Sequence, residues 1–194
     1  MQKKTFYGTI AFLIVFTLML LLFLPRAKAD WFDDEGVRVF YGISSMTKIG
    51  PDPTEVDSYS WVSGSYMLEK HLYSWLDFQT TLGVGYLESD IQSTPSIEGR
   101  ILLKAHYSIF HISIGGGPAY LFETDNIPDL ADSPIYGIIS GEVGIHFIEE
   151  EKFDVRAGYV VEHMSSPLHQ GKKGDNQDPG WNVGGIVIQT TWRF

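Results

Sequence analysis

Short stretches of alternating apolar and polar residues recur from about residue 37 to the end of the chain. They are rich in Val, Ile, Tyr, Phe, Trp and Gly, and their period of two is typical of β-strands rather than helices. Eight strands are predicted, over residues 37–46, 57–69, 75–89, 96–108, 112–123, 135–149, 153–166 and 181–194. Several exceed the ~5 to 6 residues usual in a globular protein. Strands of ~9 to 11 residues or more are what a tilted crossing of a bilayer requires.

A soluble sandwich alternates too, so the pattern needs support from other features. The connections after the first, third, fifth and seventh stretches are longer than the others and rich in Pro, Asp, Ser and Gly. Short turns on one side and long loops on the other are typical of outer-membrane barrels, as are aromatic residues near strand ends. The aromatic residues in such places are Tyr66, Trp75, Tyr86, Tyr120, Phe122, Phe147, Phe153, Trp192 and Phe194.

These patterns predict an all-β fold, an eight-stranded antiparallel transmembrane β-barrel with both termini in the periplasm. Closure is required because an open sheet edge cannot be left unpaired in hydrocarbon. The ending at Trp192 and Phe194 resembles the C-terminal signal of bacterial outer-membrane barrels. A barrel of eight strands has an interior filled by side chains. We therefore expect a lumen without a pore, with its charges paired: Arg100, Lys104, Glu142, Arg156, Glu162 and Arg193.

The first 29 residues have the pattern of a secretory signal peptide. Lys3 and Lys4 precede an apolar run, and Ala27-Lys28-Ala29 is a small-residue cleavage box. The alternative is an uncleaved anchor helix, since the run approaches the ~20 apolar residues that span a bilayer. Either interpretation predicts export. The domain boundaries are thus a signal peptide over 1–29 and an outer-membrane barrel over 30–194.

The composition limits the classes of partner and cofactor that we expect. Residues 1–29 carry four of the 14 Lys and Arg residues and none of the 24 Asp and Glu residues, so residues 30–194 have 10 against 24, a net charge of −14. A nucleic-acid partner is not expected, because phosphate binding needs a basic surface. There is no cysteine for disulfides or thiolate sites. The six histidines lie mostly on different strands without ligand spacing, so we expect no metal ion and no cofactor.

A general base and a hydroxyl group share one face of the seventh predicted strand. His163 and Ser165 alternate with Glu162 and Met164, which places both on the apolar face that should contact lipid. The arrangement allows His163 to activate Ser165 as a nucleophile. Asn182 opens the neighbouring last strand at the same height and on the same face, where it is able to orient the imidazole.

The sequence from His163 to Asn182 resembles that of the lipid A 3-O-deacylase family, also called PagL or acyloxyacyl hydrolase-like. The residues that carry the resemblance are His163-Met164-Ser165 and, after a polar loop, Asp178-Pro179-Gly180-Trp181-Asn182. The resemblance implies an outer-membrane barrel with an outward-facing triad, in which His163 is the base and Ser165 the nucleophile. The family usually has an acidic residue where this chain has Asn182. Asp178 is an alternative third member, and Glu162 a weaker one because it should point into the lumen.

A second departure concerns the oxyanion hole. The family usually has Asn where this chain has Ser166, and the next residue, Pro167, has no N–H group to donate. The donors are then expected among the backbone amides of the loop over 167–180, which contains Gly171 and Gly174. Lys172 and Lys173 in the same loop are suited to anionic lipid head groups.

The leading hypothesis is therefore an outer-membrane esterase that removes the 3-O-linked acyl chain of lipid A and has lipopolysaccharide as its substrate. The alternative is a non-enzymatic small barrel that serves adhesion or envelope integrity. A third interpretation, a lipid A acyltransferase, would add mass to lipid A instead of removing it. The sequence leaves open whether two barrels form a homodimer, and which acyl chain is preferred.

Overall fold

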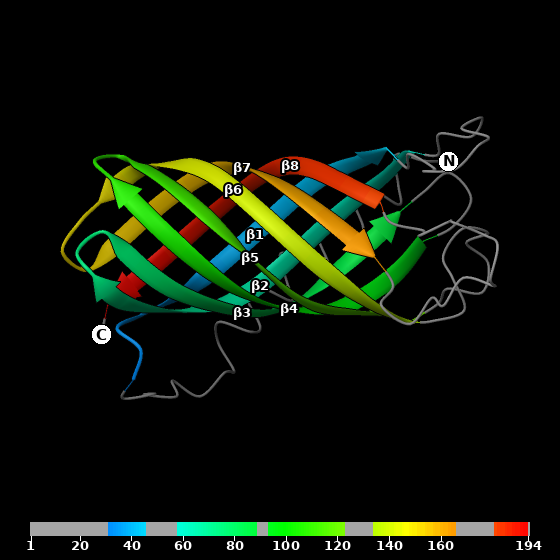
Figure 1. Cartoon of the computed structure of the whole chain (residues 1–194), viewed down its shortest axis with the longest axis horizontal. Helices are drawn as coiled ribbons and strands as arrows, with labels where there is room; N and C mark the ends of the chain where they lie inside the picture. The colour runs from blue at the N-terminus through cyan, green and yellow to red at the C-terminus, as the bar shows by residue number, and fades with distance from the viewer. Residues whose placement is uncertain (1–30, 46–57, 89–92, 123–133, 166–180, 194) are drawn as a thin grey trace.

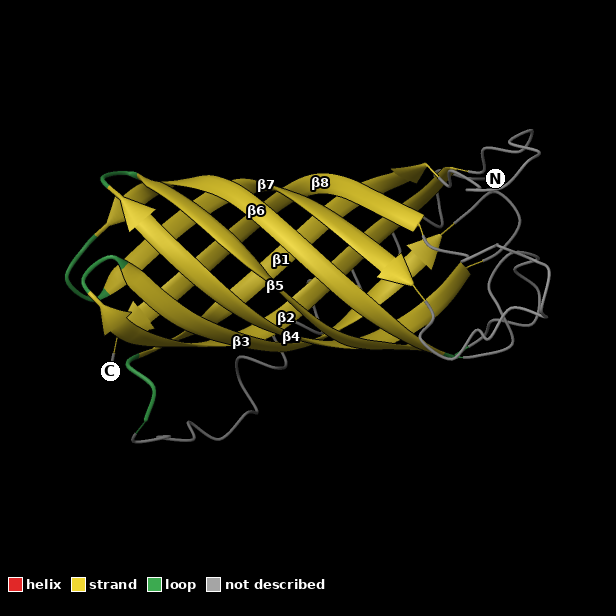
Figure 2. Ribbon diagram, viewed as in Figure 1, coloured by secondary structure: helices red, strands yellow, loops and turns green. Residues whose placement is uncertain are grey.

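The computed structural model describes residues 31–45, 58–88, 93–122, 134–165 and 181–193, and the regular structure in these ranges is β-strand (Figures 1 and 2). No helix within them is long and apolar enough to cross a membrane. The predicted signal peptide lies outside the described residues, as does Phe194. The strands are β1 Asp34–Ser45, β2 Ser58–Tyr73, β3 Leu76–Glu88, β4 Ser93–Tyr107, β5 Phe110–Leu121, β6 Ile135–Glu149, β7 Phe153–Ser165 and β8 Trp181–Arg193.

The eight strands form a closed barrel in which each strand pairs antiparallel with the next, and β8 pairs with β1 (Figure 1). Closure leaves no sheet edge with unpaired backbone groups, so the whole sheet is compatible with hydrocarbon. The predicted fold class is confirmed. We call the end with the connections β2–β3, β4–β5 and β6–β7 the turn end, and the opposite end, where β7 finishes, the loop end.

Two strand boundaries differ from the prediction in an informative way. β4 begins at Ser93, three residues before the predicted start, so residues 89–92 separate it from β3 and this connection is shorter than predicted, though still longer than those at the opposite end. β2 extends to Tyr73 through a bulge between His71 and Tyr73. A second bulge, between His146 and Ile148, turns Phe147 outward next to Ile148, where strict alternation would have placed one of them inside.

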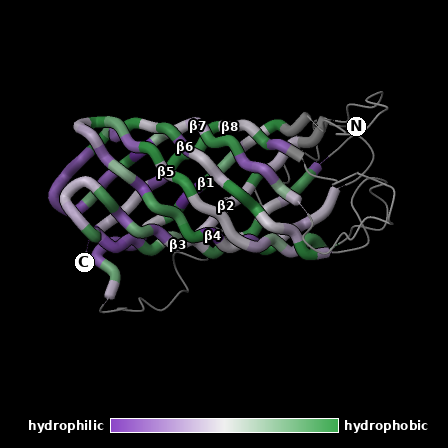
Figure 3. The backbone as a smooth tube through the Cα atoms, viewed as in Figure 1, coloured by the Kyte–Doolittle hydropathy of each residue, from purple (hydrophilic) through white to green (hydrophobic). Residues whose placement is uncertain are grey.

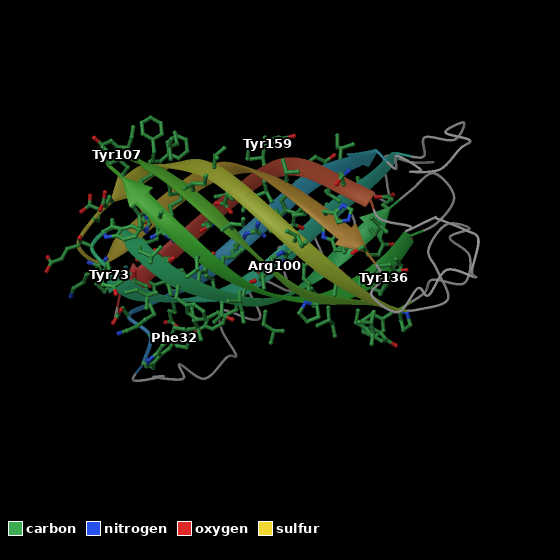
Figure 4. All side chains as sticks on the ribbon, in the orientation of Figure 1. Phe32, Tyr73, Arg100, Tyr107, Tyr136 and Tyr159 are labelled. Atoms are coloured by element: carbon green, nitrogen blue, oxygen red, sulfur yellow. The ribbon has the colours of Figure 1, made fainter. Side chains whose placement is uncertain are left out.

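The outer surface of the barrel is apolar. Leu82, Ile114 and Ile139 are each more than 60% exposed, which is the reverse of what a soluble protein does with such side chains. Tyr73 and Tyr107 project at the turn end, and hydrophilic residues gather there (Figures 3 and 4). An apolar band with aromatic residues at its border is the exterior of a protein that sits in a bilayer.

The lumen is filled by side chains in layers. At the loop end it holds an apolar cluster. In the middle, Arg100 (labelled in Figure 4) pairs with Glu98 at 2.8 Å and with Glu162 at 2.9 Å. Toward the turn end, Glu69 pairs with Lys104 and with Arg156. The charges expected in the interior are therefore paired, as a buried charge must be if it is not to destabilise the fold. Arg193 is paired too, with Asp34, but it lies at the turn end of the barrel and is half exposed instead of buried.

The entry of the chain into β1 is held by polar contacts outside the membrane-spanning strands. Asp33 accepts a hydrogen bond from Lys70 Nζ at 3.0 Å and one from the backbone amide of His71 at 2.8 Å. Burial raises the pKa of the Asp33 carboxyl, but these two bonds outweigh it, so that the pKa lies below its usual value.

Three consecutive glycines in the middle of β5 serve close backbone packing. A Cβ atom at Gly115, Gly116 or Gly117 would overlap a carbonyl oxygen of the neighbouring strand. The pairing of β5 with β6 is continuous through this segment, and the pairing with β4 has the same register before and after Gly117. The glycines therefore allow the strands to approach each other and do not form a ligand loop.

Candidate active site

β7 carries His163 and Ser165 on the outer surface at its loop end. Glu162 and Met164 are buried in the lumen, whereas His163 and Ser165 are half-buried on the outward face, in the same row as the exposed Tyr159 and Val161. The predicted placement of both residues is observed. Glu162 is bound to Arg100 inside the barrel, so it does not contact the imidazole from that side.

Asn182 lies directly opposite His163 in the pairing of β7 with β8. Its side-chain oxygen Oδ1 is 3.0 Å from Nδ1 of the His163 ring. An amide oxygen only accepts hydrogen bonds, so Nδ1 donates and Nε2 carries the free lone pair. This is the tautomer in which a histidine acts as a general base toward a hydroxyl group. The neighbour predicted from the hairpin register is thus in contact with the ring.

Ser165 ends β7 and lies opposite Gly137 of β6. Within the described residues its hydroxyl group makes no hydrogen bond with His163. The two side chains are on the same face, with Cα atoms about 7 Å apart from the rise of a strand. Contacts between nucleophile and base are often long in unliganded enzymes and tighten on binding. The site therefore consists of an oriented imidazole and a nearby hydroxyl group that is not hydrogen-bonded to it in the described residues.

The other residues suggested by the sequence lie outside the described residues. These are Asp178, the alternative third member, and the loop glycines and lysines Gly171, Gly174, Lys172 and Lys173.

The neighbour of Ser165 on the outer face of the next strand is a glycine. The cross-strand neighbours of Ser165 are Gly137 and then Pro118, which are paired in register across β6 and β5. A Cβ atom on Gly137 would meet nothing closer than the Ser165 carbonyl oxygen, at 3.8 Å. Ile135 and Ile139, on either side of Gly137 along β6, are both well exposed. Ser165 thus has as its neighbour a glycine that is flanked along β6 by two exposed isoleucine side chains.

An apolar recess of about 510 Å³ lies on the same outer face, further toward the turn end. It reaches Val161, two residues from His163 on β7, and Gly141, whose Cβ position has nothing within 4 Å. Tyr159, which projects outward in Figure 4, forms one wall, and its hydroxyl group lies against Gly184. Such a surface is compatible with hydrocarbon chains, because a chain that fills it leaves no polar group without a hydrogen bond.

The structure also brings together residues that the sequence spacing did not connect. His71, His106 and His146 come from β2, β4 and β6, and all three line one pocket at the turn end. His106 Nδ1 lies 3.2 Å from His146 Nε2. In the sequence, each of the three lies a few residues from a short turn, and this shared position is the signal by which they could have been grouped.

These features define the class of the protein. A closed eight-stranded antiparallel barrel with an apolar exterior, aromatic residues at its border and a polar, side-chain-filled centre is a small outer-membrane β-barrel.

No protein-family model matches the chain. No curated protein matches it either. Among solved structures, it is similar to the N-terminal β-barrel domain of Pseudomonas aeruginosa OprF, with 9% identity and a TM-score of 0.41 over 81% of this chain and 97% of that one. It is also similar to Neisserial surface protein A, with 11% identity and a TM-score of 0.41 over 84% of this chain and 97% of that one.

Proposed function

We propose that this barrel is an outer-membrane ester hydrolase that removes the 3-O-linked acyl chain of lipid A. The observation that carries the proposal is the contact of 3.0 Å between His163 Nδ1 and Asn182 Oδ1 on the lipid-facing surface. A histidine held in one tautomer, beside a serine and facing lipid, is suited to an ester whose acyl chains are already in the membrane. No cofactor is required.

In the proposed reaction, Ser165 Oγ attacks the ester carbonyl carbon while His163 Nε2 takes the hydroxyl proton. The tetrahedral intermediate collapses to an acyl-serine, and the imidazolium gives its proton to the departing sugar hydroxyl group. Water, activated by the same nitrogen, then releases the fatty acid and restores Ser165. Asn182 keeps the ring oriented but stabilises the imidazolium less than a carboxylate would, so we expect a slow enzyme.

The outer surface around Ser165 supports the same substrate class. An acyl chain whose carbonyl group reaches Ser165 has Gly137 and Pro118 beside it, and the recess at Gly141 lies further along the same face. Both lie on the apolar exterior, where a membrane lipid arrives without leaving the bilayer. The lumen is filled and the site faces away from it, so a substrate would reach the serine from the exterior of the barrel.

The test is to express wild-type protein, Ser165→Ala and His163→Ala separately in a host with intact lipid A, and to follow lipid A by mass spectrometry. We expect loss of one hydroxyacyl chain with the wild type, and a decrease in that product of at least about 10³-fold with either variant, as for other serine hydrolases. Ser60→Ala on β2 is a matched control that should leave the product unchanged. Full activity in either site variant would refute the mechanism, and added mass would indicate acyl transfer.

The second candidate is a non-enzymatic barrel for adhesion or envelope integrity. It is favoured by the filled lumen and by the missing hydrogen bond between Ser165 and His163 in the described residues. It predicts unchanged lipid A in all four strains and a defect in attachment or detergent resistance when the protein is deleted. The same mass-spectrometric experiment separates the two functions.

A further inference from the structure

A pocket of about 400 Å³ opens at the turn end of the barrel, far from the candidate active site. Its lining includes the imidazoles of His71, His106 and His146 and the carboxylates of Asp77 and Asp154. Glu149 and Glu150 also line it, and Arg156 and Arg193 are its basic residues, so acidic groups outnumber basic ones. A pocket with several imidazoles and an acidic surround favours a cation over an anion.

Three potential ligands meet beside this pocket. Asp34 and Glu69 are direct partners in the pairing of β1 with β2, and His71 follows Glu69 by two residues on the same inward face. One ligand atom from each of the three lies within 4.8 Å of the other two. His71 Nε2 is 3.2 Å from Asp34 Oδ2. That separation is close to the ~3.3 Å between two ligands of a tetrahedral zinc ion with bonds of ~2.0 to 2.1 Å.

The His71 ring is already oriented for coordination. Asp77 Oδ1 lies 2.8 Å from Nδ1 and Asp34 Oδ2 lies 3.2 Å from Nε2, so each ring nitrogen faces a carboxylate and donates to it. A metal ion would bind Nε2 in place of the proton that this buried nitrogen directs at Asp34, while Asp77 keeps its contact with Nδ1. A carboxylate on the far nitrogen of a histidine ligand is the usual outer contact of zinc sites, where it fixes the tautomer and raises the basicity of the ligand.

Both carboxylates already have basic partners, so a bound ion would share Glu69 and Asp34 with them. Glu69 Oε2 is occupied by Lys104, Arg156 and Gln79, whereas Oε1 accepts only from Arg156, at 3.0 Å, and retains a lone pair. Asp34 accepts from Arg193 Nε at 3.2 Å through Oδ1, and Oδ2 faces His71. Arg193 is half exposed, so it is able to turn toward solvent when a cation replaces it.

We propose that the turn end of the barrel binds one divalent transition-metal ion of the zinc class through Asp34, Glu69 and His71, with water from the pocket completing the coordination. Imidazole and carboxylate together suit this class, whereas Mg²⁺ prefers an all-oxygen octahedral site. The ion joins β1 to β2 next to the seam where β8 closes on β1. Because it binds the folded barrel, it should also raise the midpoint of thermal unfolding.

The experiment uses the barrel over residues 30–194 without a histidine tag, folded in detergent, treated with EDTA and titrated with ZnCl₂ in a calorimeter. We expect one Zn²⁺ per barrel, no heat with MgCl₂, and a rise in the unfolding midpoint with zinc alone. Asp77→Asn should weaken zinc binding by about 10- to 100-fold, as loss of an outer contact does, and His71→Gln by more. His163→Gln, at the other end of the molecule, is the matched control and should bind as the wild type does.

Folding of each variant is checked by the gel mobility of the unheated barrel, and Asp34→Asn replaces His71→Gln if the latter does not fold. The proposal is overturned if the wild type gives no heat with zinc, or if the folded His71→Gln or Asp34→Asn variant binds normally. Loss of binding in His106→Gln and His146→Gln, with normal binding in His71→Gln, would place the ion between the former pair and refute the assignment.

Discussion

Asn182 is the residue on which the proposed chemistry depends most. It contacts the imidazole through an oxygen, so it selects the tautomer, but it carries no charge to stabilise the imidazolium. His163 and Ser165 were predictable from alternation along a single strand, and Asn182 from its place opposite them in a hairpin. Asp178 lies outside the described residues, so its part in the site stays a prediction.

Two replacements of Asn182 distinguish its orienting of the His163 ring from the charge stabilisation that a carboxylate would add. Asn182→Asp should raise the rate of acyl release by about tenfold or more, because a carboxylate keeps the hydrogen bond to Nδ1 and adds charge stabilisation. Asn182→Leu should lower the rate by about tenfold or more, since Nδ1 loses its acceptor. The measurement is the initial rate of fatty acid release from lipid A vesicles. Asn182 is exposed, so both variants should fold as the wild type does; equal rates in all three would show that the contact has no role in the reaction.

The strands themselves were predictable because alternation is a local property. A residue's face follows from its position along its own strand, and β6 spans the residues expected for it. The two bulges were not predictable, since each depends on the partner strand. β4 starts earlier than predicted, and Pro95 is its third residue. Sequence rules disfavour proline within a strand, so the sequence alone favours a start after it.

Substitution of two glycines on the outer face tests how closely the strands pack. Gly116→Val should prevent folding, because a side chain at this position would overlap the backbone carbonyl of Ile138. Gly141→Ala, on the neighbouring strand, should fold normally because its Cβ position has nothing within 4 Å. Heat-modifiable mobility on a denaturing gel distinguishes folded from unfolded barrel. A folded Gly116→Val variant would contradict the close approach of β5 and β6.

The arrangement of the lumen belongs to the whole molecule and was only partly predictable. Charge pairing in general was expected, because inward charges of both signs must neutralise each other. The particular partners depend on register around the closed barrel; Arg156 of β7, for example, reaches Glu69 of β2. For the same reason the meeting of His71, His106 and His146 at the turn end is invisible in their sequence spacing. Because the lumen is filled, the exterior is the surface on which we propose that a lipid substrate binds.

Covalent labelling tests most directly whether that exterior carries a nucleophile. The folded barrel in detergent is treated with a long-chain alkyl fluorophosphonate, digested, and analysed by mass spectrometry. Our account predicts a single adduct on Ser165, formed by the wild type and strongly reduced in His163→Ala. A barrel that remains unlabelled, or an adduct on another residue with Ser165 unmodified, would contradict it.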